Sequence, residues 1–175
     1  MKLNNFLPIF ILFYVYPTPI ITKFLPVHVE SPQINNVLRV EENREDNRAA
    51  LLREYLTSKR SPLADATDDF LQTADKYGLE WTLLPAIAGV ESGFEKAGNT
   101  SDFNPFGYMC KGRPCRFESF AEAIEAVGKS IGTSRAYQKY RDTRSILELA
   151  KVYNYVSPED WTSKIIKFQQ QIKSL

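Results

Sequence analysis

Helix-start signals recur along residues 61–175 and constrain the fold more than any other feature of the chain. Ser61-Pro62 supplies a capping residue followed by a proline in the first helical turn, and Ser157-Pro158-Glu159-Asp160 opens the last helix. Ser119 with Glu122, and Ser145 with Glu148, have the spacing of a capping box. Apolar residues at helical spacing follow these signals. We therefore expect a mainly α-helical domain with at most one small hairpin.

The chain divides by composition into three parts. Residues 1–27 hold Lys2 and an apolar run from Phe6 to Thr22. As a helix this run would extend about 25 Å, less than a hydrocarbon core of roughly 30 Å, so it suits a signal peptide or a short membrane anchor. Residues 28–60 form a tether with a charged linker helix over Val37 to Lys59. Residues 61–175 form the domain, and we expect the protein to be exported.

Composition excludes several kinds of function. The net charge of the 175-residue chain is only +1, which does not favour nucleic acid as a partner. The one histidine, His28, lies before the predicted domain. A Ser-His-Asp or Cys-His catalytic group and a histidine-containing zinc site are therefore excluded within the domain. Carboxylates, tyrosines and lysines remain for acid–base chemistry, and we predict no metal and no cofactor.

The two cysteines predict a short disulfide-bonded hairpin. Lys-Gly-Arg-Pro, a turn-like sequence, separates Cys110 from Cys115. We expect the two arms to be residues 108–110 and 115–117, and we expect an oxidising compartment, in agreement with export. Closing so small a loop contributes only about 2 kcal/mol, so this disulfide would pin a loop rather than hold the fold together.

Glu91 is the strongest candidate for a catalytic residue. It ends an apolar run in which Leu83, Ile87 and Glu91 share one helix face at four-residue spacing. A buried carboxyl tends to keep its proton and can then act as an acid. Half-protonation near pH 6.5 needs a rise of about two units above the usual pKa of about 4.3, or about 3 kcal/mol. The alternative is an ordinary glutamate that faces water at a helix end. The long connection that follows, Gly93 to Phe117, has the length of a site-forming loop.

An ordered set of segments resembles a known family. The set comprises Leu84 to Phe94, Asn104-Pro105-Phe106-Gly107-Tyr108, residues 117–124, Tyr153-Asn154 and Trp161. Together these segments resemble the lysozyme superfamily, and more closely the bacterial peptidoglycan-cleaving enzymes of the lytic transglycosylase and glucosaminidase type. The resemblance covers roughly residues 61–172 and implies a lysozyme-like helical domain with a small hairpin and loop lobe.

The resemblance also implies roles for particular residues. Glu91 would be the catalytic acid, and Ser92 would orient Glu91 or the substrate. Asn104, Phe106 and Gly107 would shape the sugar groove. Tyr153 and Asn154 would line the cleft opposite the acid.

Tyrosines combine a flat apolar ring with a polar tip, so they can stack on sugar faces. Tyr137, Tyr140, Tyr153 and Tyr155 could take this role, and we predict it for Tyr108 and Tyr137. For Tyr153 the helical spacing suits the core as well as the cleft, and the resemblance favours the cleft. We assign Trp161 and Phe168 to the core.

The sequence leaves the second catalytic group open. Asp102, Glu118 and Glu95 are candidates for a second carboxylate, but none lies in a matching motif. If none reaches the cleft, the substrate's own N-acetyl group would assist, which suits a transglycosylase rather than a hydrolase.

The expected partners are peptidoglycan glycan strands, together with the membrane if the N-terminal segment is not cleaved. The protein would then be a monomer that is either anchored facing the cell wall or secreted. Two alternatives stay open. One is a non-catalytic peptidoglycan-binding module on the same fold, and the other is a structural helical protein tethered to the membrane.

Overall fold

The computed structural model describes residues 47–95 and 102–175. The predicted signal or anchor segment and much of the predicted tether lie outside these ranges. Within them, no helix is both long enough and apolar enough to cross a membrane.

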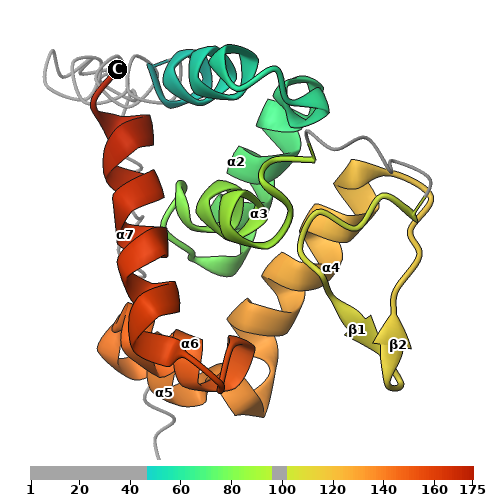
Figure 1. The fold of residues 1–175 in the computed structure, drawn as a ribbon, viewed down its shortest axis with the longest axis vertical. Helices are drawn as coiled ribbons and strands as arrows, with labels where there is room; N and C mark the ends of the chain where they lie inside the picture. The colour runs from blue at the N-terminus through green and yellow to red at the C-terminus, as the bar shows by residue number, and fades with distance from the viewer. Residues whose placement is uncertain (1–46, 96–101) are drawn as a thin grey trace, which may run out of the picture.

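The described residues form a mainly helical structure with one two-stranded sheet, as the sequence predicted (Figure 1). A helix over residues 47–58 comes first. The other elements follow in this order: η1 (Pro62–Ala66), α2 (Thr67–Tyr77), α3 (Leu83–Ser92), β1 (Met109–Cys110), β2 (Arg113–Pro114), α4 (Phe120–Thr133), η3 (Arg135–Tyr137), α5 (Gln138–Thr143), α6 (Ile146–Tyr153) and α7 (Pro158–Lys173).

Two of the predicted helix starts have the expected caps. The Ser61 hydroxyl accepts from the backbone N–H of Leu63 at 3.1 Å, although the turn that follows is the 3-10 helix η1. The Ser119 hydroxyl accepts from the backbone N–H of Glu122 at 3.1 Å and starts α4. These caps satisfy N–H groups that have no partner within the helix.

The second predicted capping box is wrong. Ser145 starts α6 without a side-chain capping bond. Glu148 instead pairs with Lys139 at 3.0 Å and with Lys151 at 2.7 Å. Two nearby ammonium groups compete for the carboxylate that the capping box would require, and charge-assisted hydrogen bonds are the stronger ones.

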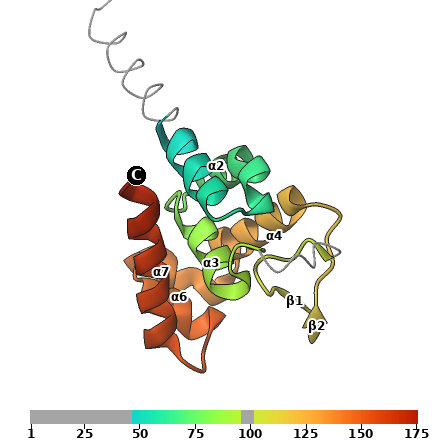
Figure 2. The same ribbon diagram turned by 45° about the horizontal axis from the view of Figure 1, so that its top comes forward.

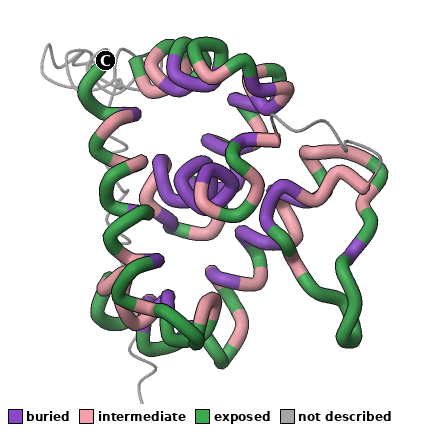
Figure 3. Tube along the Cα trace, in the orientation of Figure 1, coloured by how far each residue is buried: buried purple, intermediate pink, exposed green. Residues whose placement is uncertain are grey.

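Helix α3 lies at the centre of the fold, with α7 on one side and α4 on the other (Figure 1). Every residue from Leu83 to Gly89 is buried, which explains why this stretch is apolar all round (Figure 3). Gly89 is required here because a Cβ at this position would overlap the buried ring of Phe94. The absence of a side chain at Gly89 therefore lets the ring of Phe94, just after α3, pack against the helix.

The helix over residues 47–58 is part of the packed unit. Leu52, Tyr55 and Leu56 are buried in the same core as α3. The Tyr55 hydroxyl donates to Oε1 of Gln171 on α7 at 2.7 Å. The packed unit therefore extends N-terminal to the domain boundary predicted at residue 61.

The hairpin projects beside α4, away from α7 (Figure 2). Its strands pair antiparallel, with Met109 opposite Pro114 and Cys110 opposite Arg113. The predicted disulfide between Cys110 and Cys115 is confirmed. The second arm lies at Arg113–Pro114, two residues before the predicted start, because the turn needs only Lys111 and Gly112.

Candidate active site

Glu91 lies in the last turn of α3, where the buried part of the helix ends. Gly93 follows in the left-handed conformation, with a φ of 62°, and its N–H bonds to the carbonyl of Ala88. Ser92 takes part in this helix end. Its hydroxyl donates to the carbonyl of Ala88 at 2.9 Å and accepts from the N–H of Glu95 at 3.2 Å. The structure therefore gives the Ser92 hydroxyl two backbone partners rather than Glu91.

The carboxyl group of Glu91 is held by a tryptophan from α7. The indole N–H of Trp161 donates to Oε1 of Glu91 at 2.7 Å. Desolvation by the surrounding protein raises the pKa of Glu91, and the Trp161 hydrogen bond lowers it by a smaller amount. Glu91 also keeps an exposed surface, as a proton donor to a substrate requires. The result is a carboxyl that holds its proton more firmly than an ordinary glutamate and remains accessible.

Tyr153 joins this group from the end of α6. Its ring stacks on Trp161 with centroids 5.3 Å apart and an interplanar angle of 26°. Its hydroxyl donates to the carbonyl of Phe106 at 2.9 Å. Burial and the nearby Glu91 charge raise the pKa of Tyr153 well above its usual value, so its hydroxyl keeps its proton. Glu91, Tyr153 and Trp161 come from three helices, and we call them the helical wall.

Residues 102–117, which we call the loop wall, face the helical wall, with Phe106 bonded to Tyr153 and Gly107 beside Glu91. Asn104 organises this segment: its amide NH₂ donates to the carbonyls of Tyr108 and Cys115, both at 3.0 Å, and its Oδ1 accepts from the N–H of Tyr108 at 2.9 Å. Gly107 has a φ of 58°, and a Cβ built on it would lie 3.5 Å from Oε2 of Glu91. The two walls therefore meet where Gly107 faces the acid.

A pocket of about 370 Å³ lies beside this meeting point. Four of the predicted binding residues line it together: Gly107, Tyr108, Tyr137 and Tyr153. Burial raises the pKa of Tyr137 to about 12, so its phenol also stays protonated. The pocket thus offers aromatic rings and hydroxyl groups next to a carboxyl with a raised pKa. Among its lining residues in the described part of the chain, none is acidic.

Two other predicted binding residues, Phe106 and Asn154, have side chains that serve the fold rather than the pocket. The side chain of Phe106 is fully buried, and its ring packs edge-on against Phe70 with centroids 6.4 Å apart. Phe106 therefore belongs to the core, and only its backbone carbonyl reaches Tyr153. Asn154 ends α6, and its Oδ1 accepts from the N–H of Ser157 at 3.2 Å. The structure thus uses Asn154 to shape the turn into α7.

The three candidate second carboxylates are engaged elsewhere or are not among the pocket residues. Asp102 accepts from Nε of Arg116 at 2.6 Å. Glu118 is exposed just before α4, and its backbone N–H bonds to Glu122. Glu95 is half-buried after α3, and desolvation raises its pKa. Nor do three histidine, cysteine or acidic side chains gather as a metal-binding group anywhere in residues 47–95 and 102–175.

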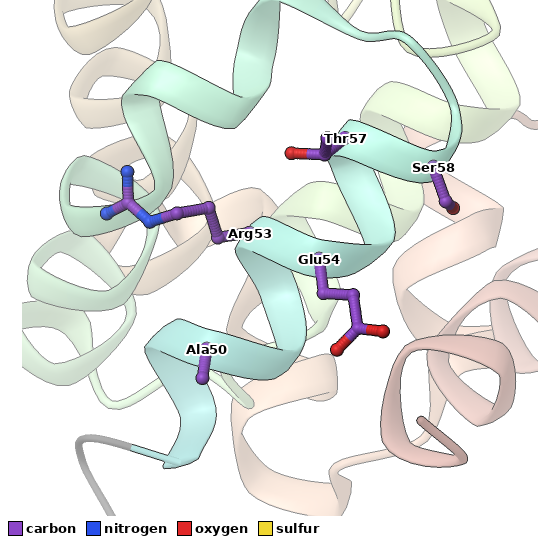
Figure 4. A pocket seen from close by; sticks show the side chains of 5 residues that line it. All are labelled: Ala50, Arg53, Glu54, Thr57 and Ser58. Atoms are coloured by element: carbon purple, nitrogen blue, oxygen red, sulfur yellow. The ribbon is translucent and has the colours of Figure 1, made fainter.

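A second hollow lies along the helix over residues 47–58 (Figure 4). It is lined by five exposed residues on one face of that helix: Ala50, Arg53, Glu54, Thr57 and Ser58. Figure 4 shows Arg53 and Glu54 extending away from each other. Because these side chains do not converge on one point, this hollow lacks the geometry of an active site.

Sequence reasoning missed part of the site. It assigned Trp161 correctly to the core, where the residue is 1% exposed, but did not predict its bond to Glu91. The available signal is general: a buried indole N–H needs an acceptor. The pocket also includes residues that were not predicted: Met109, Ser130, Ser134, Ala136 and Val152. Ser130 and Ser134, four residues apart at the end of α4, carried a weak signal as polar positions on one helix face.

Comparison with protein-family models, curated proteins and solved structures finds no significant match to this chain. The resemblance to peptidoglycan-cleaving enzymes therefore stays a prediction, and a functional assignment has to rest on the chemistry of the site.

Proposed function

We propose that this protein cleaves β-1,4 glycosidic bonds in peptidoglycan glycan strands, with Glu91 as the general acid. One observation carries the proposal. The carboxyl of Glu91, whose pKa is raised by desolvation, lies beside Gly107 at the edge of a pocket lined by Tyr108, Tyr137 and Tyr153. An accessible proton donor next to a tyrosine-rich pocket suits a substrate made of sugar rings. The protein would act on the cell wall after export.

Cleavage requires protonation of a poor leaving group. The O–H bond of Glu91 breaks as a new O–H bond forms on the glycosidic oxygen, and the C–O bond breaks with its electron pair remaining on that oxygen. Positive charge then develops at the sugar carbon. The lining residues of the pocket offer no carboxylate to stabilise it. The carbonyl oxygen of the substrate's own N-acetyl group is the nucleophile that this arrangement leaves in place.

The same surroundings favour a second candidate function. A pocket with uncharged lining residues can bind glycan strands without cleaving them, as a peptidoglycan-binding module would. The two functions differ in the role of Glu91, which is essential to cleavage and dispensable for stacking on tyrosines.

The decisive experiment compares Glu91→Gln with Glu95→Gln. Both substitutions remove a carboxyl whose pKa is raised by desolvation, and only four residues separate the two sites. We expect Glu91→Gln to slow the clearing of purified cell-wall sacculi by about 10²–10⁴-fold, the usual contribution of a general acid. Glu95→Gln should retain the wild-type rate within about twofold, because Glu95 does not line the pocket and the substitution keeps the size of the side chain.

Equal clearing by Glu91→Gln and wild type would contradict the catalytic proposal. Wild-type protein that binds sacculi and releases no fragments would support the binding module. Mass spectrometry of released fragments then identifies the reaction. An anhydro-muramyl end means that an internal hydroxyl captured the sugar carbon, and a reducing-end sugar means that water did.

A further inference from the structure

The carboxyl of Glu91 has two unequal oxygen atoms. Oε1 faces the indole N–H of Trp161 at 2.7 Å, whereas Oε2 would lie 3.5 Å from a Cβ built on Gly107, a residue that lines the pocket. An indole N–H can only donate, so the oxygen that it faces has to present a lone pair. The carbonyl oxygen of a carboxylic acid is a better acceptor than its hydroxyl oxygen, so the Trp161 bond favours Oε1 as the carbonyl oxygen and leaves the proton on Oε2.

We propose that Trp161 is a positioning residue that fixes the proton of Glu91 on Oε2, the oxygen beside Gly107. The inference rests on the proposed function, since it names a further residue for that same reaction. A carboxyl group free to rotate would direct its proton toward the protein part of the time. The Trp161 bond prevents this, so the acid is oriented before a substrate binds.

Trp161 is itself held in place from two sides. It is 1% exposed in the core, so neighbouring side chains fix its rotamer. Its ring stacks on Tyr153, whose hydroxyl is anchored to the carbonyl of Phe106 at 2.9 Å. Phe106 immediately precedes Gly107, the residue beside Oε2. This series of contacts ties the orientation of the acid to the position of the loop wall.

The same hydrogen bond acts on the energy of proton transfer. When Oε2 gives its proton to the glycosidic oxygen, Glu91 becomes a carboxylate and its negative charge spreads over both oxygens. The bond from Trp161 then becomes charge-assisted and stronger. Because the stabilisation grows as the proton leaves, it favours the transition state over the starting complex.

The other titratable groups near Glu91 do not compete for this role. Tyr108 comes from the loop wall, Tyr137 from η3 and Tyr153 from α6, and burial raises the pKa of the last two above the ordinary tyrosine value, which is already far from neutral. On α7, Glu159 is exposed and Asp160 is paired with Lys164 at 2.6 Å. Glu95, which follows α3, is a nearby acid whose pKa is also raised by desolvation. The Glu95→Gln variant removes this group, so any titration that remains belongs to Glu91.

The first test reads the hydrogen bond without measuring activity. The chain has only two tryptophans, so ¹⁵N-labelled protein gives two indole N–H resonances, with Trp81 as the internal reference. We expect the Trp161 resonance to move downfield as pH rises, with a midpoint above the ordinary glutamate pKa of about 4.3. The Trp81 resonance should not follow, and the movement should persist in Glu95→Gln and vanish in Glu91→Gln. A Trp161 resonance that does not move, or that moves equally in Glu91→Gln, overturns the inference.

The second test measures the consequence for cleavage. Trp161→Phe keeps a stacked six-membered ring but removes the N–H donor, and Trp81→Phe is the matched control. Loss of a hydrogen bond to a charged group should lower kcat about tenfold or more. It should also raise the pKa of Glu91, which shifts the alkaline limb of the pH–rate profile upward. A purely structural role for Trp161 would reduce the amount of active enzyme without shifting that limb, and this result overturns the inference.

The two tests distinguish failure of the inference from failure of the proposed function. If wild type clears sacculi while the Trp161 resonance does not titrate with Glu91, the proposed function stands and the positioning role is wrong. If the resonance titrates as expected while no glycan fragment is ever released, the catalytic role of the pair is overturned together with the proposed function. In that case the bond remains only a structural one.

Discussion

The two walls of the candidate active site are built in different ways. In the helical wall, the bond between Glu91 and Trp161 joins residues that are 70 positions apart. In the loop wall, Asn104 bonds to groups only 4 and 11 positions away, and the disulfide spans 5 positions. One wall depends on how helices pack, and the other mainly on short-range contacts within a single segment that Phe106 anchors to the core.

This difference has consequences for stability and function. The helical wall is continuous with the core, so damage to it should unfold the whole unit. The loop wall is more exposed, and its hairpin projects from the body (Figures 2 and 3). Damage there should loosen one side of the pocket and leave the remaining fold intact. Three predictions test this contrast, beginning with the largest expected effect.

Ile165→Ala tests the helical wall at its core. Ile165 is fully buried on α7, one turn after Trp161. Truncating it leaves a cavity and should lower the free energy of unfolding by about 2–5 kcal/mol, measured by urea denaturation. The matched control is Ile166→Ala, because Ile166 is 41% exposed and its loss should change stability by less than about 0.5 kcal/mol. Equal effects of the two substitutions would contradict the assignment of α7 to the core.

Asn104→Ala tests the loop wall at its organising residue. The substitution removes three hydrogen bonds, each contributing about 1 kcal/mol, so unfolding should become easier by about 3 kcal/mol at most. Because Gly107 and Tyr108 lose their support, KM for sacculi should rise even under conditions where the variant is fully folded. Asn154→Ala removes the one bond to Ser157 and serves as the stability control. If Asn104→Ala leaves KM unchanged, the loop does not shape the binding pocket.

Replacing Cys110 and Cys115 together by serine should have the smallest effect. The disulfide closes a short loop, so its loss should lower the free energy of unfolding by about 2 kcal/mol at most. We expect a small decrease in Tm and faster proteolytic cleavage confined to residues 109–114. Wild-type protein under oxidising and reducing conditions provides the control for the substitutions themselves. Complete loss of folding in the double variant would show that the hairpin supports the core.

Features that depend on neighbouring residues could be predicted from the sequence, and features that depend on distant residues could not. The disulfide, the hairpin and the cap at Ser119 were predicted, since each depends on a few neighbouring residues. Errors arose where distant groups intervened. Glu148 pairs with Lys139 as well as with Lys151, so Ser145 lacks the predicted capping box. Phe106 was predicted to contact substrate, yet its ring packs on Phe70, which lies 36 positions earlier in the chain.

The sequence by itself determined the mainly helical class, most of the helix starts and the disulfide-bonded hairpin. It also placed Glu91 on an apolar helix, which is the observation that directs attention to the site. Only the tertiary structure decided that Trp161 holds Glu91, that Tyr153 stacks on Trp161, and that the helix over residues 47–58 joins the core. Caps and turns depend on backbone groups within a few residues, so the local sequence specifies them. The partner of the Glu91 carboxyl depends on which helices pack together, and packing sums weak contacts over the whole chain.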